Sequence, residues 1–273
     1  MPVLPMHPGQ TLVMGVLNVT PDSFSDGGNF FSTDAALTQA RRLIADGADI
    51  LDIGAESARP GSDPVSEQEE LDRAAPVIEK VAKEFATPIS IDTCKPAVAD
   101  QCCQIGATIV NDVTGLTDVN MLRVVQQRRA AVVIMHMRGK PKTMQQDVDY
   151  VDVVVEVREF LAERVAAAKN AGIEEIVIDP GIGFGKSASQ NFELLQRLRE
   201  FESVGVPILI GPSRKSFLSS LRSQLPVDRH LEGTIAACCA GVMNGASIVR
   251  VHDVKAVKKA IEVIDAVRAT KAS

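Results

Sequence analysis

The sequence predicts an α/β fold, a (β/α)₈ TIM barrel that forms a single domain over residues 1–273. Roughly eight short apolar runs alternate with polar or glycine-rich turns and with amphipathic stretches, which is the pattern of repeated βα units. The apolar runs do not alternate with polar residues, as is typical of parallel strands buried on both faces. The length suits one barrel of roughly 250 residues, and no linker or change of composition divides the chain.

Strands are expected where β-branched and aliphatic residues gather between turn residues. The first strand runs into NVTPDSFSDGGN rather than into a GxGxxG motif. This argues against the alternative of a doubly wound open sheet, which usually carries that glycine motif after its first strand. The expected strands cover residues 11–18, 49–55, 88–92, 107–112, 130–136, 175–179, 206–213 and 246–252.

Five long helices are expected between and after these strands. Leu37, Ala40 and Ile44 recur at helical spacing in the first helix. Ser66 followed by Glu69 is a capping-box signature at the start of the second helix. The third ends in Asn-Ala-Gly, a common helix stop. The expected helices cover residues 34–48, 66–85, 151–172, 230–246 and 253–273.

Composition and charge exclude several classes of function. The net charge is −6, no basic run occurs and only 4% of residues are aromatic, so neither the charge nor the stacking surface of a nucleic-acid binder is present. We expect no secretion signal and no membrane span. The five cysteines are odd in number, which predicts buried thiols in a reducing cytoplasm. No HExxH motif or cysteine cluster supports a zinc centre at His136 or His252.

Polar side chains stand at the end of every expected strand. In a (β/α)₈ barrel the carboxyl ends of all strands meet at one rim, where active sites lie. A single acid at such a place is more often a cap for the next helix. The coincidence over eight strands nevertheless indicates a site for a polar, charged small molecule. These residues are Asn18, Glu56, Asp92, Asn111, Asp112, His136, Asp179, Ser213, Lys215, Arg250 and His252.

Three loops beside these strand ends are candidate ligand-binding segments. SARPGS (57–62) and GFGKS (183–187) are expected to point backbone N–H groups at phosphate oxygens. Arg59 can add a bidentate cation to the first of them. TPDSFSDGGNF (20–30) is either a solvated connection or a lid whose Phe24 covers an aromatic substrate.

Seven motifs, in order along nearly the whole chain, resemble dihydropteroate synthase. They are MGVLNVTPDSFSDGG (14–28), ESARPG (56–61), ISIDT (89–93), IVND (109–112), DPGIGFGK (179–186), GPSRKSFL (211–218) and IVRVHDV (248–254). The resemblance implies a (β/α)₈ barrel that is usually a homodimer. It also implies condensation of p-aminobenzoate with 6-hydroxymethyl-7,8-dihydropterin pyrophosphate in folate biosynthesis, with Mg²⁺ present and pyrophosphate released.

The resemblance places the pterin among charged and amide side chains. Asp92, Asn111 and Asp179 match the positions that bind the polar edge of the pterin. Lys215 would donate to a ring oxygen or nitrogen, and Arg250 would lie flat on the ring as a cation–π contact. In the dry interior of a barrel such hydrogen bonds discriminate strongly between ligands.

The resemblance places the pyrophosphate beside Asn18, Arg59 and His252, with Asn18 as the protein ligand of Mg²⁺. One neutral protein ligand is adequate because Mg²⁺ keeps several waters and binds through substrate phosphates. Arg59, Lys215 and His252 are the expected catalytic residues, because charge develops on the leaving oxygens. The residues expected to frame p-aminobenzoate, with which sulfonamides would compete, are Phe24, Pro60, Phe184 and Ser216.

Two alternatives remain open from the sequence. A pterin-dependent methyltransferase acting on a corrinoid shares the pterin-binding acids and amide, but it does not need two loops that grip pyrophosphate. A paralogue that binds pterin without turnover is suggested by Ala58, which stands where the family has Thr or sometimes Ser. The lost hydroxyl contact is worth about 0.5–1.5 kcal/mol, which is too little to abolish catalysis. Glu56 and Ser57 are expected to be local supports of this loop.

Overall fold

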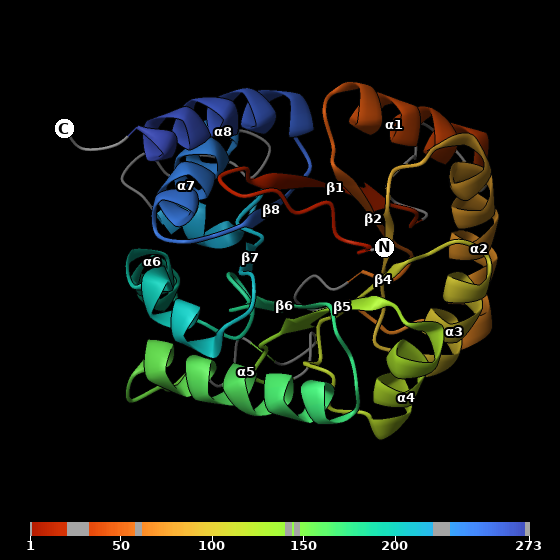
Figure 1. Cartoon of the computed structure of the whole chain (residues 1–273), viewed down its shortest axis with the longest axis horizontal. Coiled ribbons are helices and arrows are strands. Elements are labelled where there is room, and N and C mark those ends of the chain that lie inside the picture. Colours follow the sequence, from red (N-terminus) through yellow and green to blue (C-terminus); the bar gives the residue numbers. More distant parts are fainter. Residues whose placement is uncertain are drawn as a thin grey trace.

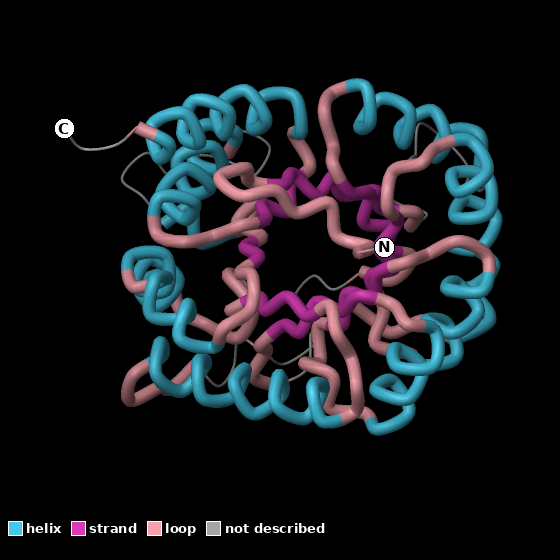
Figure 2. Tube along the Cα trace, viewed as in Figure 1, coloured by secondary structure: helices cyan, strands magenta, loops and turns pink. Residues whose placement is uncertain are grey.

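Eight parallel strands form a ring, and the helices form an outer layer around it (Figures 1 and 2). The computed structural model describes residues 2–20, 33–57, 62–139, 144, 148–220 and 230–270. The strand order is β6-β5-β4-β3-β2-β1-β8-β7, and the neighbouring pairs are parallel. A parallel bridge between Ile178 and Ile208 joins the two ends of this order, which confirms the predicted (β/α)₈ barrel.

The strands lie within the predicted apolar runs, where nearly every side chain is buried. The largest difference is β7, whose regular part is only two residues long. Pro207 and Pro212 flank it and have no N–H to donate to a neighbouring strand. The strands are β1 (Leu12–Asn18), β2 (Ile50–Gly54), β3 (Ile89–Asp92), β4 (Ile109–Asp112), β5 (Ala131–Met135), β6 (Ile176–Asp179), β7 (Leu209–Ile210) and β8 (Ile248–Val251).

A helix follows each strand. The Ser66 hydroxyl accepts a hydrogen bond from the N–H of Glu69 at 3.2 Å, so the predicted cap of the second helix is confirmed. The helices are α1 (Thr33–Ala45), α2 (Glu67–Glu84), α3 (Pro96–Gln104), α4 (Val119–Arg128), α5 (Val153–Asn170), α6 (Ala188–Gln196), α7 (Leu231–Met243) and α8 (Val254–Ala269). Two 3₁₀ helices, η2 (Leu198–Val204) and η3 (Ser216–Ser220), lie before and after β7.

The inside of the ring is apolar toward the amino ends of the strands and polar toward their carboxyl ends. On β2, Ile50 belongs to an inner apolar cluster, and Asp52 faces the same interior because side chains alternate along a strand. On β4, Ile109 and Asn111 repeat this arrangement. The residues between them, such as Leu51 and Val110, pack in the larger core beneath the helices. The barrel therefore presents its polar layer at one rim.

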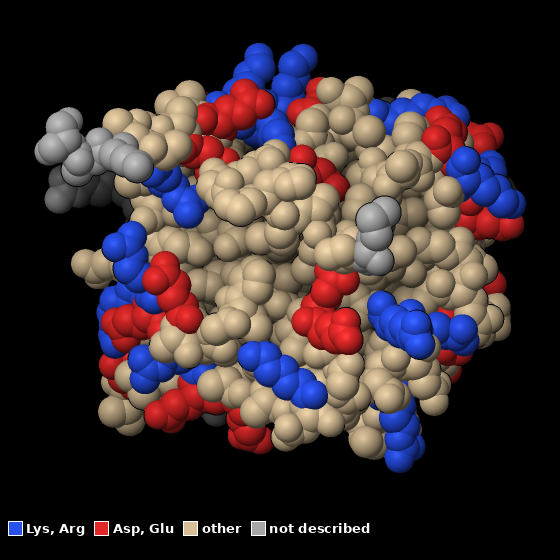
Figure 3. Space-filling view, in the orientation of Figure 1, with Lys and Arg blue, Asp and Glu red and all other residues tan. Residues whose placement is uncertain are grey.

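The segment before β1 closes the amino end of the barrel, and Figure 1 shows it crossing the opening of the ring. Leu4 packs in the inner apolar cluster and is only 7% exposed. The N–H groups of Val3 and Leu4 donate to the Glu175 carboxylate at 2.7–3.0 Å. Figure 3 shows that the middle of this face is mostly uncharged, with charged side chains around its edge. The segment is thus an apolar plug.

Leu4→Ala is expected to lower the free energy of unfolding by about 2–3 kcal/mol, because it empties buried apolar volume. Catalytic activity should not change, since the plug lies at the end of the barrel opposite the polar rim. Urea denaturation measures the first effect, and Val151→Ala, at a side chain that is fully exposed, is the matched control. Equal stability of the two variants would show that the segment does not plug the barrel.

Within the described ranges, no helix has both the length and the apolar character needed to cross a membrane. The five cysteines are free thiols. Cys102 in α3 and Cys238 in α7 are buried, as expected, whereas Cys94, Cys103 and Cys239 are partly exposed. Burial raises the pKa of Cys102 to about 12, so this thiol is inert at neutral pH.

Candidate active site at the carboxyl ends of the strands

The structure brings the described site residues together at the carboxyl rim. Asn18, Asp92 and Asp179 are the last residues of β1, β3 and β6. Asn111 lies near the end of β4, and Arg250 lies in β8. Because the strands are parallel and in a closed ring, these five side chains, which are far apart in sequence, come from one rim.

The other predicted residues lie in the loops above this rim or outside the described residues. Lys215 and His252 follow β7 and β8, and Ser216 begins η3. Phe184 is buried in the loop between β6 and α6. The residues outside the described part of the chain are Phe24, Ala58, Arg59 and Pro60.

Arg250 is held at the centre of the rim by two carboxylates. Its Nε donates to Asp52 Oδ2 at 2.6 Å, and one terminal nitrogen donates to Asp92 Oδ2 at 2.7 Å. Asn111 donates to the same Asp52 oxygen at 3.3 Å. Charge-assisted bonds of this kind fix the guanidinium plane. The array therefore offers a fixed cation, a carboxylate and an amide to one ligand.

Asp52 is a site residue that the sequence did not single out. It is fully buried on β2, and its Oδ1 has no hydrogen-bond partner within the described residues. An acid inside the apolar run DILDI was the available signal. The role of Asp52 in the site depends on its bond to Arg250, which is 198 residues away in the sequence and adjacent only in the barrel.

Burial changes the acid–base behaviour of the rim acids. It raises the pKa of Asp179 to about 6, against the opposing effects of the Gly181 N–H and of Lys215. It also raises the pKa of Asp92 to about 7, although Arg250 favours the carboxylate. A ligand that donates N–H groups to these oxygens would favour the ionised form of both.

Lys215 lies over the ring of Phe184, with its Nζ 3.7 Å from the ring centroid. This is the geometry of a cation–π contact. Gly183 lies against the aliphatic stem of Lys215, and a Cβ on Gly183 would be 2.8 Å from Lys215 Cδ. The loops after β6 and β7 therefore pack together and present an aromatic ring and a cation at the same side of the rim.

His252 is positioned by Ser213. The Ser213 hydroxyl and His252 Nδ1 are 3.0 Å apart, and the N–H of His252 donates to the same hydroxyl at 3.2 Å. Burial, with Arg250 nearby, lowers the pKa of His252 to about 3, so the imidazole is neutral without a ligand. An anion beside it would favour its protonation. His252 can therefore contribute a hydrogen bond and, with an anion bound, charge.

Comparison with known proteins assigns the barrel and its rim to a family. The pterin binding enzyme family matches residues 14–252. The chain belongs to this family. The dihydropteroate synthase of a Synechocystis strain is 46% identical, over 96% of this chain and 94% of the relative. The predicted resemblance to dihydropteroate synthase is thus confirmed.

Solved structures agree with this membership of the pterin-binding family. Xanthomonas albilineans dihydropteroate synthase with 4-aminobenzoic acid has a TM-score of 0.90 and 44% identity, over 96% of this chain and 94% of that chain. Yersinia pestis dihydropteroate synthase, in a complex with a sulfonamide drug, has a TM-score of 0.91 and 40% identity, over 97% of both chains.

In this pterin-binding enzyme, the residues that precede the ARPG segment (58–61) are held firmly. Lys95, before α3, bonds to Glu56 and lies 2.6 Å from the buried carboxylate of Glu70. Arg73 on α2 donates to the carbonyl of Ala55 at 3.0 Å. These contacts agree with the expected role of Glu56 as a local support.

The GFGKS segment differs from the expectation that its N–H groups are free for a phosphate. The N–H of Gly183 donates to the buried Asn191 side chain at 2.6 Å, and that of Phe184 donates to the Gly181 carbonyl at 3.1 Å. The N–H of Ser187 donates to Gln190 at 2.7 Å. These three donors are used inside the protein, so they are not free for a phosphate.

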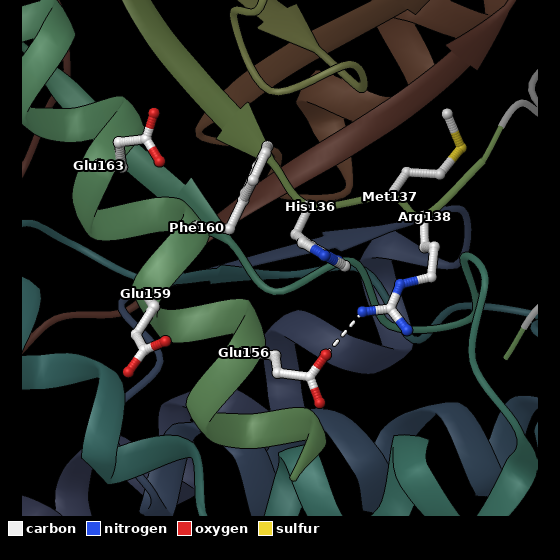
Figure 4. Close-up of a pocket in the computed structure, with 7 residues that line it drawn as sticks. All are labelled: His136, Met137, Arg138, Glu156, Glu159, Phe160 and Glu163. Atoms are coloured by element: carbon white, nitrogen blue, oxygen red, sulfur yellow. Dashed lines mark hydrogen bonds and ion pairs between the residues drawn. The ribbon is translucent and has the colours of Figure 1, made fainter. Parts of the chain in front are cut away.

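A cavity of about 460 Å³ lies outside the rim array, between the end of β5 and helix α5 (Figure 4). Arg138 reaches toward the helix and forms an ion pair with Glu156 at 2.7 Å. The rings of Phe160 and His136 form a T-shaped pair, with centroids 5.0 Å apart. The cavity contains none of the residues expected to bind pterin, pyrophosphate or p-aminobenzoate, so we do not assign it to the reaction.

Proposed function

We propose that this protein is a dihydropteroate synthase, which condenses p-aminobenzoate with 6-hydroxymethyl-7,8-dihydropterin pyrophosphate. The products are 7,8-dihydropteroate and pyrophosphate. The observation that carries the proposal is the buried array of Arg250, Asp52, Asp92 and Asn111 at the rim of a barrel that is 46% identical to a dihydropteroate synthase. Its relatives support synthesis rather than corrinoid methyl transfer.

The pterin suits this array because its edge carries N–H donors beside a carbonyl oxygen. The carboxylates of Asp92 and Asp179 can accept from the donors, and the Asn111 amide can both donate and accept. The flat face of the ring can lie on the Arg250 guanidinium, whose plane is fixed by Asp52 and Asp92. Recognition by buried polar groups rejects ligands that leave those groups unpaired.

The reaction replaces one bond at the pterin methylene carbon with another. The bond from this carbon to the pyrophosphate oxygen breaks, the bond to the arylamine nitrogen forms, and the nitrogen then loses a proton. The arylamine is neutral at pH 7, so the site needs no strong general base. The electron-rich pterin ring can stabilise positive charge on the carbon while the departing oxygens gain negative charge. We expect Arg59 and His252 to stabilise that negative charge.

Mg²⁺ is the cofactor that we propose beside the pyrophosphate. Asn18 Oδ1 and Asp92 Oδ2 lie on the same side of Gly54, at 3.8 and 3.6 Å from where a Cβ of that glycine would stand. Oxygen donors of this kind suit Mg²⁺, and no cluster of three His, Cys, Asp or Glu in the described ranges offers a closed protein site. Asn18 and the substrate phosphates would hold the ion, which supplies positive charge near the leaving group.

The p-aminobenzoate half of the proposal is tested with a sulfonamide. The Yersinia pestis relative binds such a drug, and we expect competition here because Phe184 and Ser216 lie beside Lys215 at the rim. The sulfonamide should raise the apparent KM for p-aminobenzoate without lowering kcat in steady-state assays. Inhibition that p-aminobenzoate cannot overcome would contradict this placement.

We also propose a homodimer in the cytoplasm. Helices α6 and α7 form an apolar groove of about 330 Å³ that includes Phe192, Ala236 and Ala240. Phe192 is 37% exposed, and small residues on α7 allow another helix to approach closely. Ala240→Glu should convert the dimer to a monomer in sedimentation experiments, and a dimeric variant would place the interface elsewhere. The free thiols accord with a reducing compartment.

A further inference from the structure

Lys186 is a buried lysine whose side chain no step of the proposed reaction uses. It is 3% exposed, and among the described residues no carboxylate forms an ion pair with it. Instead its Nζ lies 2.9 Å from the carbonyl oxygen of Phe184, 3.1 Å from that of Gly181 and 3.3 Å from that of His136. It also lies 3.1 Å from His136 Nδ1. One ammonium thus joins the end of β5 to the loop after β6.

The loop folds closely around this ammonium. Gly181 has a φ of +71°, and a Cβ there would lie 1.9 Å from the carbonyl oxygen of His136 and 3.2 Å from Lys186 Nζ. A side chain at Gly181 would therefore push the loop away from β5. Burying an ammonium is costly unless it is fully hydrogen-bonded. The carbonyl groups around Lys186 meet that requirement only when the loop keeps this conformation.

The same loop carries groups that face the substrates. The N–H of Gly181 donates to Asp179 Oδ1 at 2.7 Å, so the residue whose carbonyl binds Lys186 also orients the Asp179 carboxylate. The carbonyl of Phe184 binds Lys186, and the ring of Phe184 lies under Lys215 Nζ. Lys186 therefore acts on Asp179, an expected pterin contact, through Gly181. It bonds directly to the backbone of Phe184, an expected p-aminobenzoate contact.

We propose that Lys186 is a positioning residue for the reaction, whose ammonium holds the loop after β6 so that Asp179 and Phe184 face the substrates. The proposal rests on the proposed function for the identity of those substrates. It does not rest on it for the geometry, which is a property of the free protein. Lys186 itself touches neither substrate.

The charges around Asp179 give this role a distinctive signature. The cations that favour its carboxylate are Lys215, Lys186 and Arg250. Burial lowers the pKa of Lys186 to about 7, with Arg138 and Lys215 acting in the same direction and Asp179 opposing them, so Lys186 is an ammonium below that pH. His136 is neutral because burial lowers its pKa to about 2. Loss of Lys186 removes one cation and releases the Gly181 N–H from its position. Both changes raise the pKa of Asp179 further above its usual range.

The test compares Lys186→Met, which keeps most of the side-chain volume, with Lys258→Met. Lys258 is a partly buried lysine bound to Asp49, away from the rim, so its loss controls for destabilisation. For Lys186→Met we expect kcat/KM for both substrates to fall on the order of 10- to 100-fold, the size typical of a misplaced site. The acid limb of its pH profile should move to higher pH, while Lys258→Met should keep the limb of the unmodified protein.

A second measurement does not depend on turnover. Carboxyl ¹³C NMR of the ligand-free protein follows the titration of Asp179, assigned by the resonance that disappears in Asp179→Asn. We expect the midpoint to rise in Lys186→Met. If that variant does not fold, Lys186→Gln, which keeps a smaller neutral donor, should show the same direction of change.

The outcomes separate this proposal from the proposed function. An Asp179 midpoint and an acid limb that do not move in a folded Lys186 variant would overturn the positioning role, even if activity fell. If the Asp179 midpoint rises in the Lys186 variant but the unmodified protein makes no dihydropteroate, the positioning role is supported and the proposed function is contradicted.

Discussion

Asp179→Asn is expected to lower kcat/KM for the pterin substrate by about 10³-fold. Two charge-assisted hydrogen bonds from pterin donors to a buried carboxylate are worth about 1.5–3 kcal/mol each. The NH₂ group of the new asparagine side chain would also face an N–H donor of the pterin. Steady-state kinetics at fixed p-aminobenzoate measure the loss, and Asp72→Asn, at an exposed acid on α2, is the matched control. A loss of less than about tenfold would remove Asp179 from the pterin site.

The pH dependence of the same residue has a definite sign. Burial raises the pKa of Asp179 to about 6, so pterin affinity should fall as the pH drops through that value and the carboxylate is protonated. The stability of the ligand-free protein depends on pH in the opposite direction. Because the folded pKa is raised, Asp179 lowers stability as the pH rises from about 4 to about 6. Above this range, thermal unfolding should therefore show that Asp179→Asn stabilises the ligand-free protein.

Arg59→Ala is expected to lower kcat by about 10²- to 10³-fold, the cost of removing one preorganised group that stabilises a developing oxyanion. Arg59→Lys, which keeps the charge but not the bidentate fork, should recover part of the rate. Ala58→Thr should change affinity by no more than about tenfold, because one neutral hydrogen bond is worth about 0.5–1.5 kcal/mol. Rapid-quench measurement of pyrophosphate release compares the three variants. Similar effects of Arg59→Ala and Ala58→Thr would show that the pyrophosphate lies elsewhere.

The barrel could be predicted from local sequence because each strand is a short, continuously apolar run between turn residues. The sequence pattern did not reveal helices α3, α4 and α6, which were not among the predicted helices. These are nine or ten residues long, and α3 begins at Pro96 without a side-chain cap. Helices this short are only marginally stable on their own, so packing against their neighbours stabilises them.

The rim residues could be predicted because a parallel barrel brings all strand ends to one side. What the sequence did not reveal are contacts between distant strands. Asp52 becomes a site residue only through Arg250. Lys186 sits in a glycine-rich motif that suggests phosphate binding, yet its ammonium is buried against carbonyl groups. Such roles depend on which neighbours the fold supplies, and no local pattern contains that information.

The central claim is tested most directly by incubating the purified protein with dihydropterin pyrophosphate, p-aminobenzoate and Mg²⁺. Dihydropteroate and pyrophosphate are then measured together by chromatography and mass spectrometry. The proposed function predicts that the two products form in equal amounts and that neither forms without p-aminobenzoate. Pterin that binds to the protein without any dihydropteroate being formed would contradict it.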